Sequence, residues 1–282
     1  MRFMYCIEQS RVYPGAYHWA VYIRISSRQC GWFLCASRSG VDSPAQRSFL
    51  PSPKYRNLIL AGLPPPVLRR LGPHLKKLNL PQGKTLTMPN RNVRFAYFLE
   101  SGLASIVTTM TDGTSVEVAV VGREGMAGIP VVLDSVSMPN RTFMQIGGSG
   151  HRLEAAVLVA EYQRSSELRH KITHYVHAHL VQASQTAACN RLHEISKRLA
   201  RWLLLCRDRI GSNQLMITHQ SLSDMLGTPR PTVTLAASAL QKSGAIRYSR
   251  GRVEILDRKR LEKISCECYE AIRRETARLG VL

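Results

Sequence analysis

The sequence has no long apolar run and no paired-cysteine motif, and each absence removes a class of protein. No stretch approaches the roughly 18 apolar residues that a membrane-spanning helix needs. Near residue 1, no basic segment leads into an apolar one as it would in a secretion signal. The seven cysteines include no CxxC pair, so neither a zinc ribbon nor a thioredoxin-like motif is predicted. We expect a soluble protein of the reducing cytoplasm.

Sequence patterns of catalysis are also missing. There is no Walker-type phosphate loop, no GxSxG elbow and no paired-carboxylate site. A metal-dependent β-roll enzyme would need clustered histidines on its strands, yet residues 84–150 contain no histidine. The sequence therefore predicts a protein that is not an enzyme, with no catalytic residue and no metal site.

Acidic residues are scarce relative to basic ones. The chain has 39 Lys and Arg against 19 Asp and Glu, a formal charge of +20. The excess is strong at the C-terminal end, where residues 191–282 hold 18 basic and nine acidic residues. Such a balance favours a polyanionic partner, which is either nucleic acid or an anionic membrane surface.

The pattern of apolar residues divides the chain into segments. Residues 1–56 show no sustained period and predict a poorly ordered extension, whose place in the natural protein the sequence leaves open. Residues 58–78 have helical spacing broken by prolines and predict two short helices. From residue 84 to about 145 the period is two, and Asp112-Gly113 is a strong hairpin signal. Short strands with this density of turns predict a small sandwich or roll.

Residues 166–190 predict one long helix with a single apolar stripe. The stripe consists of Leu168, Ile172, Val176, Leu180, Ala183 and Ala187, at steps of three or four. The small residues at its end would let a second helix approach closely, and in a homodimer that helix belongs to a second copy. We interpret the stripe as a dimer interface. Packing of the helix on its own domain is the alternative.

Residues 217–234 have the pattern of a helix-turn-helix. Leu222 and Leu226 lie one turn apart and give the first helix a buried face, while Gly227 can adopt the positive φ that the turn requires. Thr228 suits the N-cap of the second helix, with Pro229 at its first position. The alternative is an ordinary pair of packed helices.

A basic β-hairpin is predicted directly after the second helix, over residues 246–255. Ile246 and Tyr248 alternate on one side, Arg250 and Gly251 form the turn, and Val253 begins the return strand. Helix, glycine turn, helix and basic hairpin, in that order, predict a winged helix-turn-helix.

Nine residues of this region are candidate DNA contacts. Arg230 stands at the N-terminal end of the second helix, which enters the major groove, and suits the O6 and N7 acceptors of guanine. Thr218 opens the first helix, where free N–H groups suit a phosphate. The complete set is Thr218, His219, Thr228, Arg230, Thr232, Thr234, Arg247, Arg250 and Arg252. For each arginine taken singly, a solvated surface charge is the alternative.

These motifs resemble those of the Crp/Fnr family of bacterial transcription regulators, from about residue 57 to residue 269. The closest matches are the segments VGREGM (121–126), CNRLH (189–193), RLARWLL (198–204), PTVT (231–234), YSRGR (248–252) and CECY (266–269). The resemblance implies a cyclic-nucleotide-binding-like sensor built as a double-stranded β-helix (jelly roll). It also implies a dimerising helix, a DNA-binding domain for near-palindromic sites, and RNA polymerase as a partner.

The chain departs from that family at the effector site. Members that bind cyclic nucleotides carry a Gly-Glu-hydrophobic-Gly element, whose Glu holds the ribose hydroxyl, followed by an Arg-Ser pair. Here the element contains Gly125, Met126 and Gly128, and a methionine cannot accept the ribose hydrogen bonds. Arg141 and Thr142 stand for the Arg-Ser pair. These five residues are the candidate effector site. No cofactor is certain, and a cyclic nucleotide is not expected.

The second helix of the helix-turn-helix, which is the recognition helix in that family, also departs from the family's pattern. Cyclic-AMP-responsive members follow the guanine-contacting arginine with Glu and, a turn later, another Arg. Pro231 and Leu235 occupy those positions here, so we expect a different operator. The oxygen-sensing branch has an N-terminal cysteine cluster for an iron–sulfur centre, whose spacing Cys30 and Cys35 do not match.

Two smaller groups of residues stay open to interpretation. His170, His174 and His177 are spaced to share a metal on one helix face, to act as a pH switch, or to form a polar flank of the apolar stripe. Cys266 and Cys268 could sense oxidants or pack at the C-terminal end.

We predict an α+β regulator in four parts. They are an extension over 1–56, a sensor roll over 57–165, a dimerisation helix over 166–190 and a winged helix-turn-helix domain over 191–282. The predicted function is sequence-specific binding of double-stranded DNA as a homodimer, as an activator or repressor, under control of an unknown small-molecule effector and with no membrane partner. The alternatives are a constitutive DNA-binding protein whose roll is only a dimerisation scaffold, and a redox-sensing regulator.

Overall fold

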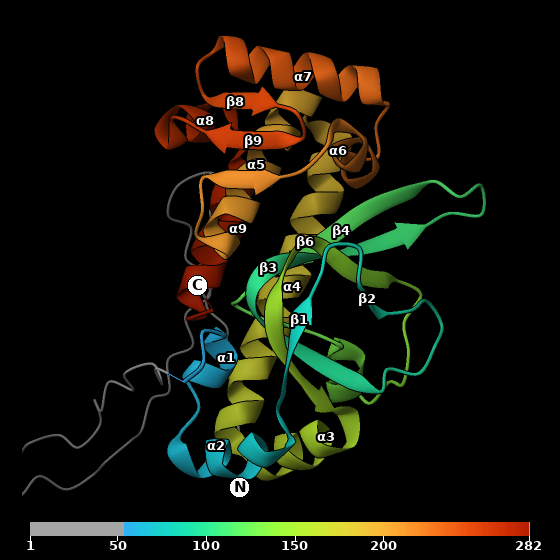
Figure 1. Ribbon diagram of the computed structural model, residues 1–282, viewed down its shortest axis with the longest axis vertical. Helices are drawn as coiled ribbons and strands as arrows, with labels where there is room; N and C mark the ends of the chain where they lie inside the picture. The colour runs from blue at the N-terminus through green and yellow to red at the C-terminus, as the bar shows by residue number, and fades with distance from the viewer. Residues whose placement is uncertain (1–53, 282) are drawn as a thin grey trace, which may run out of the picture. The chain divides into compact units, whose positions relative to one another are not determined.

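The computed structural model describes residues 54–281, and the predicted extension over 1–56 lies almost entirely outside them. All described residues belong to one compact unit of the chain. An antiparallel sheet with covering helices is followed by the long helix α4 and then by a smaller helical domain with its own three-stranded sheet (Figure 1). The predicted α+β fold is confirmed.

The first helices are shorter than their spacing predicts. Helix α1 covers Leu58–Ala61, α2 covers Pro65–Leu71, and a 3₁₀ turn covers Gly72–His74. The prediction of helix as far as Leu78 was wrong, because strand β1 (Lys76–Leu80) pairs there with β6. Pairing with a distant strand overrides a local apolar period.

The roll consists of strands β1 to β6. After β1 these are β2 (Thr85–Thr87), β3 (Phe95–Thr109), β4 (Ser115–Val121), β5 (Met126–Ala127) and β6 (Arg141–Glu154). All strand pairs are antiparallel. The strand order is β1-β6-β3-β4, and in addition β2 pairs with β6 and β5 pairs with β3. The predicted hairpin joins β3 to β4: Asp112 Oδ1 accepts from Thr114 N at 2.9 Å, and Gly113 has a φ of 86°.

Helices α3 (Ala155–Arg164) and α4 (Ser166–Leu192) follow the roll. Ser165 caps α4 by accepting from Leu168 N at 3.2 Å. The buried face of α4 packs on the chain's own roll and α5, and it consists of Leu168, Ile172, Tyr175, Ala178, Gln182, Thr186 and Cys189.

That packing corrects part of the predicted dimer interface. Leu168 and Ile172 are fully buried in the core of their own subunit, so they cannot contact a partner in this structure. Only Val176, Leu180, Ala183 and Ala187 keep exposed or half-buried side chains. The apolar pattern alone gave the spacing of the stripe but not which of its residues the roll would cover.

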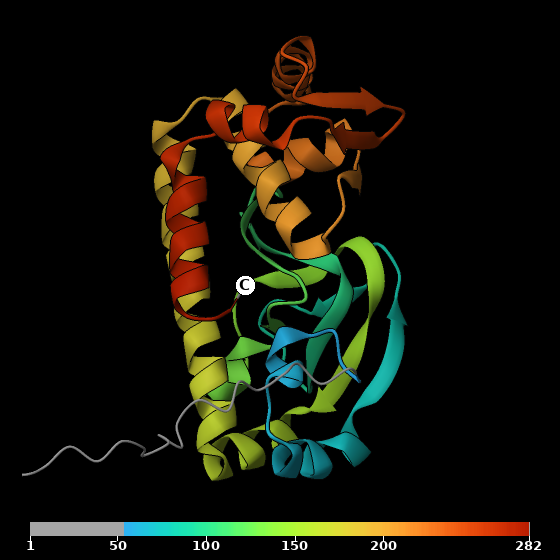
Figure 2. The same cartoon turned by 90° about the vertical axis from the view of Figure 1, so that its left-hand side faces the viewer.

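The C-terminal domain begins with α5 (Ile195–Ile210) and strand β7 (Gln214–Met216). It continues with α6 (His219–Leu226), α7 (Arg230–Lys242), β8 (Ile246–Ser249), β9 (Arg252–Ile255), α8 (Arg258–Ile264) and α9 (Glu267–Arg278). Helix α9 turns back and runs alongside α4 (Figure 2).

Among residues 54–281, no helix combines the length and the apolar character that crossing a lipid bilayer requires.

The candidate nucleic-acid interface

The start of α6 is held by its own first residues and by the wing. Thr218 is the N-cap, and its Oγ1 accepts from Ser221 N at 3.1 Å. His219 N donates to the hydroxyl of Tyr248 at 3.1 Å, and the two rings stack at 4.0 Å between centroids with planes 15° apart. Because Tyr248 belongs to β8, this stack fixes the wing against α6.

The turn between α6 and α7 follows the predicted pattern. Gly227 has a φ of 56°, which glycine adopts without the strain of a side chain. Ser223 is small where the helices meet, and its hydroxyl donates to Thr228 O at 2.6 Å. Leu222 and Leu226 are buried as predicted.

The start of α7 differs from the prediction by one residue. The first helical acceptor is Pro229 O, which accepts from Val233 N at 3.2 Å, so Pro229 is the N-cap and Arg230 the first helical residue. The proposed N-cap at Thr228 was wrong, since its carbonyl is already engaged by Ser223. Within residues 54–281 no side chain caps α7, so its first turn keeps N–H groups available beside an exposed arginine.

Thr234 links the two helices instead of pointing freely outward. Its hydroxyl donates to Arg230 O at 3.0 Å and accepts from His219 Nδ1 at 3.1 Å. Burial lowers the pKa of His219, and the nearby charge of Arg230 lowers it further, so the ring is neutral at pH 7. We conclude that His219 and Thr234 position the helices, whatever else they contact.

The wing turns at Arg250 and Gly251, both with positive φ, at 47° and 77°. Two residues with positive φ form the type of turn that joins twisted antiparallel strands. Arg250 and Arg252 are exposed, whereas Arg247 forms an ion pair with Glu254 of β9 at 3.0 Å.

The start of α6, the start of α7 and the tip of the wing surround one surface depression. Its volume is about 430 Å³, and it is lined by Thr218, His219, Gln220, Arg230, Tyr248, Arg250 and Gly251. Four of the nine predicted DNA contacts therefore share one concave surface. Thr228 and Thr232, half-buried, flank the start of α7.

Leu235 is a further candidate contact, which is not among the nine predicted from the sequence. Its side chain is 72% exposed on α7, one turn after Pro231 and on a helix whose buried face is Val233, Ala236, Ala237 and Leu240. An exposed leucine on a recognition helix suits the methyl group of thymine. Its position off the apolar stripe was the signal that could have identified it.

The candidate effector residues lie within a packed part of the roll. Met126 is fully buried, its carbonyl accepts from Tyr175 Oη at 3.1 Å, and a side chain on Gly125 would collide with the same tyrosine ring. Thr142 is buried, while Arg141 donates to Thr85 Oγ1 at 3.1 Å. A ligand could reach Met126 only by displacing part of the core.

The helical histidines contact α9 and not a common ligand point. His174 Nδ1 lies 3.1 Å from Leu279 O, and His177 Nε2 lies 3.1 Å from Glu275 Oε1. The rings of His170 and His174 have centroids 3.9 Å apart, and their planes are tilted by 49°. These contacts favour the interpretation as a polar flank.

The fold and this site define a class of protein, in which a winged helix-turn-helix DNA-binding domain follows an antiparallel roll in the chain. Residues 197–264 match the family model of the Crp-like helix-turn-helix domain. Residues 197–264 therefore form a Crp-like helix-turn-helix domain, and the described residues have the fold of Crp/Fnr-type regulators.

Solved structures of that type share the fold. FixK2 from Bradyrhizobium japonicum is 15% identical over 68% of this chain and 98% of its own, with a TM-score of 0.60. A Crp/Fnr-family transcriptional regulator from Eubacterium rectale is 19% identical over 72% and 94%, with a TM-score of 0.57. A CRP-family regulator from Thermus thermophilus is 20% identical over 67% and 96%, also with a TM-score of 0.57. No curated protein gives a significant match.

Proposed function

We propose that the chain binds near-palindromic DNA sites as a homodimer, with α7 in the major groove and Arg230 contacting guanine. The observation that carries this proposal is the exposed Arg230 at the uncapped start of α7, sharing a depression with Arg250 of the wing. A helix N-terminus with an arginine suits base edges, and the flanking wing arginine suits the phosphate backbone.

The surface of α4 supports the dimer. Val176, Leu180, Ala183 and Ala187 form an apolar stripe that the other described residues leave exposed or half-buried, with Leu180 64% exposed. Two copies of α4 packed along this stripe would carry two recognition helices, which two half-sites about 34 Å apart require.

Control by an effector and contact with RNA polymerase belong to the same proposal. An effector acting on the roll would change how the two α4 helices pack and so the spacing of the recognition helices. The buried position of Met126 favours a second candidate, in which the roll is only a scaffold. Melting of the full chain with libraries of small molecules separates them: a Tm shifted by a compound supports a sensor, and a Tm that no compound shifts favours a scaffold.

Selection of sites from random duplex DNA tests the DNA-binding part. We expect the wild type to enrich a two-fold symmetric motif and Arg230→Ala to lose discrimination at one base pair per half-site, by about 1–3 kcal/mol. Arg69→Ala, which removes an exposed arginine of α2, is the matched control and should enrich the wild-type motif. An Arg230→Ala protein that selects the same motif equally well would contradict the proposal.

A further inference from the structure

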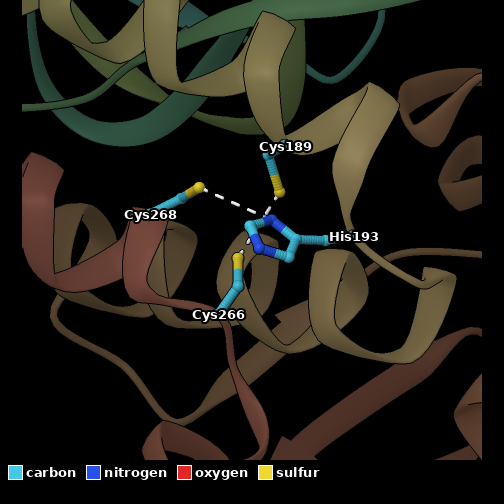
Figure 3. A group of neighbouring side chains, drawn as sticks. All are labelled: Cys189, His193, Cys266 and Cys268. Carbon is cyan, nitrogen blue, oxygen red and sulfur yellow. Dashed lines mark hydrogen bonds between the residues drawn. The ribbon is translucent and has the colours of Figure 1, made fainter.

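Four metal-ligating side chains converge between α4 and the start of α9. Cys189, His193, Cys266 and Cys268 each offer one ligand atom, and these atoms all lie within 4.8 Å of one another (Figure 3). The Sγ atoms of Cys189 and Cys266 are 3.4 Å apart, and Cys268 Sγ lies 3.6 Å from His193 Nδ1. The three thiols are buried, and the histidine side chain is only 14% exposed.

Two short pairs from distant parts of the chain supply the four groups. Cys189 lies in the last turn of α4, and His193 is the residue that caps this helix. Cys266 is the N-cap of α9, and Cys268 lies in its first turn. The pairs have spacings of three residues and one residue between ligands, and the packing of α9 on α4 brings them together.

The separations fit a single tetrahedral ion. With zinc–sulfur bonds of about 2.3 Å and zinc–nitrogen bonds of about 2.0 Å, neighbouring ligand atoms of a tetrahedron lie roughly 3.5–3.8 Å apart. The Cys189–Cys266 and Cys268–His193 separations, 3.4 and 3.6 Å, are close to that range. A disulfide between Cys189 and Cys266 would need a separation of about 2.05 Å. An iron–sulfur cluster distributes its cysteines over two or more iron atoms and needs a wider site.

The surroundings also suit a metal–thiolate site. His193 Nε2 lies 3.2 Å from Glu267 Oε1, which leaves Nδ1 free to face the thiols, as in carboxylate–histidine–zinc arrangements. Arg201 is only 3% exposed, and its Nη1 donates to Thr186 Oγ1, one turn before Cys189. Its Nε has no hydrogen-bond partner among the described residues. A buried guanidinium favours negative charge nearby, which Glu117 and a metal–thiolate group at Cys189 would both supply.

We propose that Cys189, His193, Cys266 and Cys268 bind one Zn²⁺ ion as a closed structural site. Binding releases three thiol protons to solvent and leaves the imidazole neutral, so the ion and three thiolates carry a net charge of −1, which Arg201 offsets. Thiolate and imidazole ligands in a tetrahedron select zinc over the hard cations. With all four positions filled by protein, the ion has no open coordination site for catalysis.

The site joins the end of the long helix to the end of the chain. It fixes α9 along α4 and holds the link between α4 and α5, where the roll is connected to the DNA-binding domain. This replaces the sequence-based expectation of no metal site and gives Cys266 and Cys268 a role other than oxidant sensing. The proposed zinc site depends only on the fold of one chain and not on the proposed dimer or operator.

Metal analysis of the purified full chain tests the proposal. We expect one zinc per chain in the wild type and its loss in Cys268→Ser and Cys189→Ser. Cys206→Ala, which removes a buried thiol of α5 outside the cluster, is the matched control and should keep the ion. Zinc content unchanged in Cys268→Ser would overturn the proposal, because the ion would then be bound elsewhere.

Two measurements remain informative if a cysteine variant fails to fold. Wild type loaded with Co²⁺ should show the visible absorption of a tetrahedral thiolate-bound cobalt ion. Glu267→Gln, at a side chain that is 81% exposed, should keep the fold but lose zinc to a competing chelator about 10–100-fold more readily. A zinc-free wild type that binds no cobalt, or a Cys189–Cys266 disulfide found by mass spectrometry, would refute the site.

Discussion

Glu117 is a buried carboxyl group at the junction of the roll and α5. It accepts hydrogen bonds from Ser105 Oγ and from Trp202 Nε1, the latter at 2.7 Å. Desolvation raises its pKa to about 7, although both hydrogen bonds and the charges of Arg201 and Arg209 oppose the rise. The folded protein therefore binds a proton at Glu117 more tightly than the unfolded chain does.

Stability should fall as pH rises through this group. Because the folded pKa is raised, the stabilising effect of protonated Glu117 is complete below about pH 4.5 and is lost as pH rises through about 7. The expected loss is about 3 kcal/mol. Urea unfolding at pH 5 and pH 8 should show this difference between wild type and Glu117→Gln, whose uncharged amide can still bond Trp202. The exposed Glu154→Gln is the control, and identical pH profiles for wild type and Glu117→Gln would contradict the prediction.

The ion pair of Arg209 and Glu124 is a second buried contact between the roll and α5. The side chains of Arg209 and Glu124 are 4% and 2% exposed, and Arg209 Nε lies 2.9 Å from Glu124 Oε1. Arg209 Nη2 also donates to Gln182 Oε1 on α4 at 2.5 Å. Arg209→Met should cost about 3–5 kcal/mol in urea unfolding, since it leaves a buried carboxylate unpaired.

Two controls separate this effect from general damage. The double variant with Glu124→Met should recover most of the loss, because no unpaired charge remains. Arg273→Met breaks an exposed pair of α9 and should cost less than about 1 kcal/mol. Equal costs for the Arg209 and Arg273 variants would show that the buried pair is not a special contact.

At the scale of elements, the arginines of the wing differ in whether they form an ion pair within the hairpin. Arg252 is exposed on β9, whereas Arg247 is held by Glu254 on the neighbouring strand. We expect Arg252→Ala to weaken DNA binding about uniformly across sequences and to reduce the salt slope by about one, as for loss of one phosphate contact. Titrations at several salt concentrations measure this. Arg247→Ala, in the same hairpin, should change the slope less, and the reverse order would contradict the assignment.

At the scale of the whole molecule, the open stripe of α4 should decide the oligomeric state. Leu180→Glu places a charge in the centre of the proposed interface and should convert a dimer to a monomer in sedimentation experiments, with much weaker binding to a two-half-site operator. Leu133→Glu alters another leucine, 57% exposed on the roll, and should leave the dimer intact. A wild-type protein that is monomeric on DNA would end the dimer proposal.

Much of the DNA-binding domain follows from local rules. Gly227 marks the turn and Arg250-Gly251 the wing tip because both places require positive φ, and the apolar spacing of α6 and α7 gives their buried faces. The N-cap of α7 was predicted one residue too early, at Thr228. Only the hydrogen bond from Val233 N to Pro229 O identifies Pro229 as the N-cap.

The sequence by itself determined the order of elements, the basic surface and the recognition helix, since each depends on residues close together in the chain. Only the tertiary structure decided that Leu168 and Ile172 belong to the core, because an apolar stripe does not specify what covers it. Only the packing of α9 on α4 brought His193 and Cys266 together, since residues so far apart in sequence meet only through packing between helices.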